Sequence, residues 1–181
     1  MNYELTSNTR QFGGTIFTQI RAAKDIGSFA KAGDLGGWIE KEYNLSQVGD
    51  AWVYGDAEVS GNAGVYGDAE VYGNAEVSGN ARVFGNAQVF DNAQVYGKAC
   101  VKRGQYTSTP TSISRSDSYT FTLQSDGSVV AGCRDFTPEQ ADAHWGEPSH
   151  YMHDESWAII QALRSVSAAR AKVMEGANKT H

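Results

Sequence analysis

The chain has 181 residues and a formal net charge of −6 at pH 7, a length that suffices for one ordinary domain or two small ones. It contains no run of eighteen apolar residues, and its first residues lack the basic-then-apolar order of a signal peptide, so we expect a cytoplasmic protein with no membrane partner. No basic cluster that could bind phosphates is present, so direct nucleic-acid binding is not expected.

Residues 1–48 are predicted to form an N-terminal cap and a first, degenerate coil of the repetitive segment that follows. Residues 14–25 (GTIFTQIRAAKD) have the composition of a β-strand, and three glycines within residues 33–38 indicate a tight entry into the repeat. Ile39 and Leu45 fall in register with the alanine positions of the repeat, which predicts that the coils begin before residue 49.

Residues 49–102 consist of nine consecutive hexads of the form Gly-(Asp/Asn)-Ala-x-Val-x. Only Asp91 departs from the glycine position, and Lys98 in the last hexad departs from the Asp/Asn position. Alanine and valine lie two residues apart and therefore point to the same side of an extended segment, whereas the x residues point to the other side. Glycine followed by Asp or Asn indicates a corner. Three hexads thus predict a triangular coil, and successive coils stack in parallel about 4.8 Å apart. A flexible glycine-rich tract is the alternative, but the alanine and valine positions never fail.

The repeat, represented by Val-Tyr-Gly-Asn-Ala-Glu at residues 71–76, resembles the hexapeptide repeat of left-handed β-helix proteins. This resemblance implies left-handed coiling and a homotrimer, which is common among proteins similar in fold. It also implies that acyl transfer from coenzyme A must be considered. Residues 20–57 resemble the opening of bacterial and prophage-encoded hexapeptide-repeat proteins, which implies a phage or prophage setting.

Outward side chains eighteen residues apart are expected to form columns on the three faces of the coil stack. Two faces carry aromatic columns and the third is mainly polar. The candidate binding residues on these faces are Trp52, Tyr54, Tyr66, Glu70, Tyr72, Arg82, Phe84 and Phe90. Aromatic ladders also suit strand surfaces for structural reasons alone. Contiguous exposed apolar columns usually cover an interface, however, and this interpretation is preferred.

Residues 103–118 are rich in Ser and Thr and predict a linker, and residues 119–181 predict a C-terminal ββαα module. Two extended runs around the turn at residues 124–127 predict a β-hairpin. Thr137 and Pro138 predict the start of a helix that ends at Gly146. A second helix is expected to begin near Asp154. Its apolar face consists of Trp157, Ile160, Leu163, Val166 and Val173. Residues 119–145 resemble a C-terminal module of phage-encoded proteins.

The sequence offers no catalytic motif. Acyltransferases of similar fold use a histidine as general base between neighbouring subunits, whereas this chain has no histidine before His144. The remaining candidate bases, Glu58, Glu70 and Glu76, are expected to face solvent without a partner that would raise their pKa. No catalytic residue is therefore assigned, and an acyltransferase with an atypical base remains the alternative.

Potential metal ligands gather in the C-terminal module. The group consists of His144, His150, His153, Asp154 and Glu155. Their spacing matches no established motif, and polar capping between two helices accounts for them, so no metal and no cofactor are predicted. Cys133 with His144 as nucleophile and base is disfavoured, and Cys133 is expected to be a small buried residue behind the hairpin.

The sequence therefore predicts a mainly β protein, a left-handed parallel β-helix with a small α+β module. We expect a non-catalytic binding protein, phage or prophage encoded and acting in the host cytoplasm. Its expected partner is a host protein or a small nucleotide-like ligand, bound at the clefts between the subunits of a homotrimer. The phage setting suggests a role against host defence. A DNA mimic is disfavoured, because residues 49–102 carry only seven acidic against three basic side chains.

Overall fold

The computed structural model describes residues 1–132 and 134–177 and divides the chain into two compact units, Met1–Pro110 and Thr111–His181. Each unit has a hydrophobic core of its own. Strands account for 42% of the chain and helices for 19%. Among the described residues, neither helix combines the length and the apolar character that crossing a bilayer requires.

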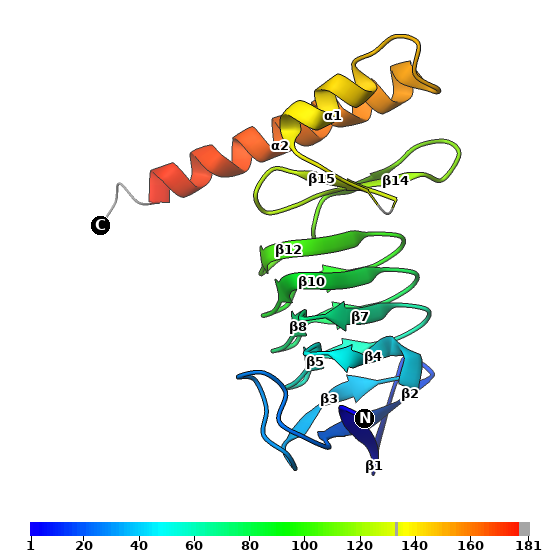
Figure 1. Ribbon diagram of the computed structural model, residues 1–181, viewed down its shortest axis with the longest axis vertical. Helices are drawn as coiled ribbons and strands as arrows, with labels where there is room; N and C mark the ends of the chain where they lie inside the picture. Colours follow the sequence, from blue (N-terminus) through cyan, green and yellow to red (C-terminus); the bar gives the residue numbers. More distant parts are fainter. Residues whose placement is uncertain (133, 178–181) are drawn as a thin grey trace. The chain divides into compact units, whose positions relative to one another are not determined.

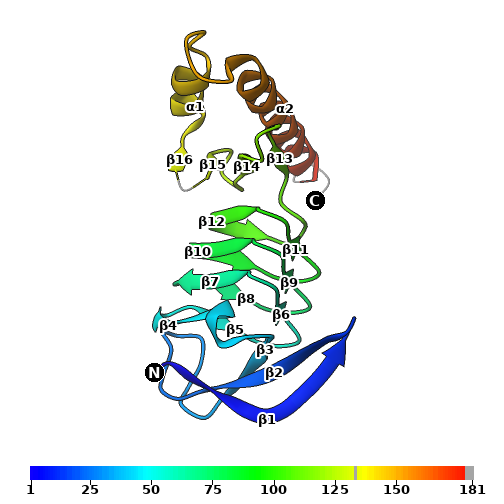
Figure 2. The same cartoon turned by 90° about the vertical axis from the view of Figure 1, so that its right-hand side faces the viewer.

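The first unit is a β-solenoid of about four turns, whose stacked coils are seen from two sides in Figures 1 and 2. One ladder of parallel strands consists of β3 (Leu35–Ile39), β6 (Glu58–Val59), β9 (Glu76–Val77) and β11 (Gln94–Val95). The second sheet has the order β4 (Leu45–Gly49), β7 (Gly64–Gly67), β10 (Arg82–Val89), β8 (Glu70–Val71) and β5 (Trp52–Val53), and β12 (Cys100–Tyr106) also pairs with β10. Because β10 pairs first with β7 and then with β8, it passes around a corner of the coil and joins two faces.

The alternation within the hexad places its alanine and valine side chains in the core. Val59, Val77 and Val95 lie in register on successive coils, and none of them is exposed to solvent. The predicted parallel stacking and the inward positions are thus confirmed. The corners are confirmed as well, because every glycine position of the hexads has a positive φ, including Asp91 at 57°.

The hexad glycines are also required by the close approach of neighbouring coils. A Cβ added to Gly79, whose φ is 71°, would lie 3.0 Å from the backbone nitrogen of Gly97 on the next coil. A Cβ added to Gly97, whose φ is 68°, would have no atom within 4 Å. Gly79 is therefore constrained by both conformation and contact, whereas Gly97 is constrained by conformation alone.

The first coil is longer than the others. Ile39 pairs with Val59 and Leu45 pairs with Val65, twenty residues onward, whereas Gly49 pairs with Gly67, eighteen residues onward. The predicted alignment of Ile39 and Leu45 with the alanine positions is therefore wrong, since both fall at valine positions. Two extra residues between Leu45 and Gly49, where the register shifts, account for the difference.

An N-terminal hairpin extends the β3 ladder. It consists of β1 (Tyr3–Phe12) and β2 (Thr15–Ala22), and β2 pairs antiparallel with β3. The strand predicted within residues 14–25 is confirmed by β2. Arg10 joins the hairpin to the coils, because its guanidinium lies 4.3 Å from the centre of the Trp38 ring and 2.8 Å from a carboxylate oxygen of Glu58.

A buried tyrosine fixes the start of the chain against the first coil. The Tyr3 hydroxyl lies 2.6 Å from the carbonyl oxygen of Glu42, in the short helix η1 (Glu42–Asn44), and 3.0 Å from that of Leu45. Burial, together with the charge of Glu42, raises the pKa of Tyr3 to about 12. The phenol is therefore held in its protonated form.

The second unit is a four-stranded antiparallel sheet with two helices on one face (Figures 1 and 2). Its strands are β13 (Ser112–Ser114), β14 (Thr120–Leu123), β15 (Val129–Ala131) and β16 (Arg134–Phe136), and its helices are α1 (Pro138–Trp145) and α2 (His153–Ala177). The predicted hairpin corresponds to β14 and β15. The predicted caps of α1 are confirmed, since Thr137 accepts a hydrogen bond from the backbone of Gln140 and the helix ends at Gly146.

Three details of the second half of the chain differ from expectation. The segment 103–118, expected as a linker, contains the end of β12 and all of β13, and β13 and β16 add two strands to the predicted hairpin. On α2, Ile160 and Leu163 are buried as expected, but Val173 is 72% exposed because this end of the helix extends past the sheet's core. Cys133 lies outside the described residues.

Candidate functional site

One surface of the solenoid carries a stacked aromatic column, which we call the Tyr54 column: Tyr54, Tyr72 and Phe90. The ring centres of Tyr54 and Tyr72 are 4.8 Å apart with planes 9° from parallel, and those of Tyr72 and Phe90 are 4.9 Å apart with planes 1° from parallel. The column forms because residues eighteen apart occupy equivalent positions on successive coils. All three side chains are half-buried, so the predicted column is confirmed and part of each ring remains accessible.

A polar ladder runs beside this column and is centred on Glu70. One carboxylate oxygen of Glu70 accepts a hydrogen bond from the side-chain amide of Gln88 at 2.6 Å, and the other accepts one from the Tyr54 hydroxyl at 3.2 Å. Gln88 in turn accepts a hydrogen bond from the amide of Gln105 at 2.9 Å. Glu70 is only 4% exposed, so the expectation that it faces solvent without a partner is wrong. The Glu70 side chain is buried between the Tyr54 column on one side and the side-chain amide of Gln88 on the other.

Trp52 is not available to a ligand, although the sequence placed it among the candidate binding residues. Its side chain is 1% exposed. A Cβ added to Gly36 would lie 2.6 Å from Ile20 and 2.8 Å from the Trp52 ring, which shows how closely β2 and β3 cover this tryptophan. The N-terminal strands therefore convert an outward repeat position into a core position.

A second aromatic column, the Tyr66 column, consists of Tyr66 and Phe84, whose ring centres are 5.4 Å apart with planes 13° from parallel. Arg82 is exposed next to this column, in register with Gly64 and Cys100 on the neighbouring coils. Burial raises the pKa of Tyr66, and the charge of Arg82 and its hydrogen bond to Tyr66 oppose that shift. Arg82 therefore meets the phenol oxygen of the column.

The tyrosines of the Tyr54 column are hydrogen-bond donors at neutral pH. Burial raises the pKa of Tyr54, and the charge of Glu70 raises it further. Burial raises the pKa of Tyr72 as well. Since both oxygens of Glu70 already accept hydrogen bonds, this surface combines flat rings, protonated phenols and a carboxylate with partners. Such a combination suits binding of a partner better than proton abstraction.

The third face of the solenoid is polar, as expected. Glu58 forms the ion pair with Arg10, and Glu76 accepts a hydrogen bond from Gln94 at 3.2 Å. The other two candidate bases thus also have partners, contrary to the expectation from the sequence. Tyr96 is the one aromatic residue among the outward positions of this face, and it is 59% exposed.

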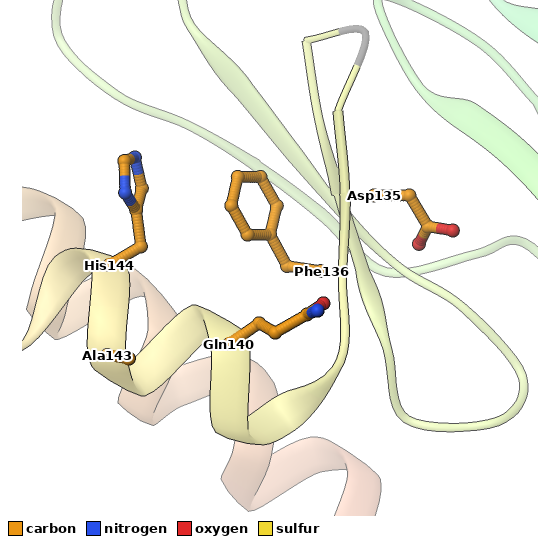
Figure 3. A pocket seen from close by; sticks show the side chains of 5 residues that line it. All are labelled: Asp135, Phe136, Gln140, Ala143 and His144. Carbon is orange, nitrogen blue, oxygen red and sulfur yellow. The ribbon is translucent and has the colours of Figure 1, made fainter.

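The second unit contains a separate hollow of about 440 Å³. It is lined by Asp135, Phe136, Gln140, Ala143 and His144, and Figure 3 shows His144 and Gln140 projecting from α1 beside Phe136 of β16. The ring of His144 stacks on that of Phe136 with centres 5.2 Å apart. The Nε2 atoms of His144 and His150 are 3.1 Å apart.

The remaining members of the predicted histidine and acidic group point elsewhere. His153 contacts the carbonyl oxygen of Trp145 through Nδ1 at 3.1 Å, and Glu155 accepts hydrogen bonds from the backbone and hydroxyl of Ser116 at 2.7 Å. Within residues 1–132 and 134–177, no three His, Cys, Asp or Glu side chains are arranged to hold a metal ion. The Cys133–His144 pair cannot be placed, since Cys133 lies outside the described residues.

Sequence reasoning missed Gln88 and Gln105, which complete the polar ladder. The signal for Gln88 was present, because it follows Glu70 by eighteen residues and therefore lies directly over it. Gln105 follows Gln88 by seventeen residues, since the last coil is one residue shorter along this face, and the repeat does not predict it. The chain matches no protein-family model, and no curated protein matches it.

Proposed function

We propose that the chain is a non-catalytic binding protein that assembles as a homotrimer and engages its partner at the clefts between subunits. The observation that supports this function is the Tyr54 column, three parallel and half-buried rings beside the Glu70–Gln88–Gln105 ladder. Stacked rings suit a flat apolar partner, and amides that still have free hydrogen-bonding capacity suit a polar one.

The two aromatic columns suit a closed three-fold assembly. In this assembly the Tyr54 column of one subunit meets the Tyr66 column of the next, so both columns are used and the contact closes after three copies. Burying a ring such as Phe84 or Phe90 contributes about 1.5–3 kcal/mol of transfer free energy before association costs are subtracted. Arg82 lies beside the Tyr66 column, where it meets the carboxylate and amide ladder of the neighbouring subunit.

We also infer that the solenoid coils left-handedly and that the N-terminal hairpin caps it. The Gly-(Asp/Asn)-Ala-x-Val-x repeat supports a left-handed hexapeptide-repeat helix, and the pairing of β2 with β3 supports a capping role for the N-terminal hairpin. The partner is a host protein or a small nucleotide-like ligand. The phage or prophage setting and the role against host defence rest on the resemblance of residues 20–57 and 119–145 alone.

The oligomeric state is the direct test. Light scattering after size exclusion at micromolar concentration should give about three times the chain mass of 19.5 kDa. Phe84→Glu and Phe90→Glu should each convert the trimer to monomers, because a charge would be buried at the contact. Tyr96→Glu is the matched control on the third face and should remain trimeric. A wild-type mass near that of one chain would refute both the trimer and its clefts.

The bound partner is tested separately, by native mass spectrometry of the protein purified from bacteria. A small molecule retained by the wild type and lost from Phe90→Glu would support ligand binding in the cleft. Acetyl transfer from acetyl coenzyme A that disappears in Glu70→Gln would instead favour the acyltransferase. That outcome conflicts with the hydrogen bonds that already engage both oxygens of Glu70.

A further inference from the structure

Two imidazole rings meet in the second unit, at the C-terminal end of α1. His144 lies in the last turn of α1 and His150 in the connection between α1 and α2, and both are partly exposed. Their Nε2 atoms are 3.1 Å apart, while their ring centres are only 4.4 Å apart with planes at 69°. The ring centres are closer than an end-to-end arrangement would place them, so the two rings are inclined to each other and leave space beside the line that joins the two nitrogens.

The contact of the other ring nitrogen of His150 determines which of its atoms carries a proton. Nδ1 of His150 lies 2.9 Å from the carbonyl oxygen of Tyr151, which can only accept, so this nitrogen carries a proton and donates it. The Nε2 of a neutral His150 ring therefore has a free lone pair. A ring nitrogen held by a backbone carbonyl in this way is the usual arrangement of a metal-binding histidine.

His144 is suited to act as the second ligand. Its Nε2 is the ring atom that faces His150, 3.1 Å from the Nε2 of that residue. The stacking of His144 on Phe136 and its edge contact with Trp145, with ring centres 4.8 Å apart, restrict the rotation of the ring. A proton placed on Nδ1 of His144 leaves a lone pair on Nε2 for a metal ion.

We propose that Nε2 of His144 and Nε2 of His150 form a binding site for a divalent transition-metal ion of the class that prefers imidazole, namely Cu²⁺, Ni²⁺ or Zn²⁺. An ion about 2.0–2.1 Å from each nitrogen fits between two atoms that are 3.1 Å apart. The resulting angle at the metal is about 100°, between the square-planar and tetrahedral values. Water completes the coordination, since no third such ligand is positioned nearby among the described residues.

Binding of Cu²⁺, the ion expected to bind most tightly, is measured on the full-length protein at pH 7.5 by calorimetry and by electron paramagnetic resonance. The wild type should bind one ion with two coordinated nitrogens. His150→Ala should weaken binding by at least about tenfold and leave one nitrogen. His153→Ala is the matched control, because His153 lies in the same region and turns its Nδ1 to Trp145, and it should bind as the wild type does.

His144→Asn is a second variant that removes the other proposed ligand. Circular dichroism verifies that each variant keeps the wild-type fold. Equal Cu²⁺ affinity in the wild type and His150→Ala would overturn the site, as would equal losses in His150→Ala and His153→Ala. Absence of binding to the wild type at millimolar Cu²⁺ would also overturn it. In that case the two rings share a hydrogen bond and have no metal-binding role.

Discussion

Two glycine substitutions separate the effect of backbone conformation from that of coil stacking. Gly97→Ala places a side chain at a φ of 68° in open space, so it should cost only the left-handed conformation, about 1–2 kcal/mol. Gly79→Ala has the same conformational cost at a φ of 71°, and its Cβ also lies 3.0 Å from the Gly97 backbone nitrogen. Separating two coils to relieve this contact should add about 1–3 kcal/mol, for a total of about 2–5 kcal/mol.

Guanidinium denaturation, followed by far-ultraviolet circular dichroism and by tryptophan fluorescence, measures the free energy of unfolding of both variants. Gly79→Ala should be the less stable by more than the error of the extrapolation. Equal costs for the two variants would refute the role of coil contact. A Gly97→Ala variant as stable as the wild type would refute the role of the positive φ.

Two further predictions concern the N-terminal hairpin. Arg10→Ala should lower the free energy of unfolding by about 1–2 kcal/mol, because it removes the contact with Trp38 and the ion pair with Glu58. Arg10→Lys should recover only part of this loss. A thermal midpoint of Arg10→Ala equal to that of the wild type would contradict the prediction. Tyr3 has a folded pKa of about 12, above the ordinary value of 10, so its stabilising proton is retained below pH 10 and lost as the pH rises from 10 to 12. The difference in thermal midpoint between the wild type and Tyr3→Phe should therefore shrink over that range, and a constant difference would argue against it.

The core of the solenoid could be predicted from the sequence because every coil imposes the same conditions on it. Alanine and valine must point inward and glycine must occupy the corner, so each hexad gives independent evidence for the same structure. Residues such as Val77 and Gly79 are placed correctly for this reason. The aromatic columns follow as well, since the coil length alone determines that Tyr72 lies over Tyr54.

The parts that depend on non-repetitive segments could not be predicted. Trp52 and Glu70 occupy the same outward position on successive coils, yet β2 and β3 cover Trp52, and the repeat carries no information about them. β13 has only three residues and a single apolar side chain, Ile113, and this pattern is too short to predict a strand. The contact between His144 and His150 depends on the path of the connection between α1 and α2, which has no periodic pattern.

The core and the surface of the solenoid respond differently to insertion or deletion of residues. Its interior repeats every six residues, because each hexad contributes the same alanine and valine wherever it lies on the coil, whereas its surface repeats every eighteen, because only then does a side chain return to the same face. Insertion of one hexad would therefore keep the core filled while moving every later outward residue to the adjacent face. In evolution, such an insertion could separate Tyr72 from Phe90 and build a different surface at little cost in stability. Only changes of three hexads would conserve the surface columns.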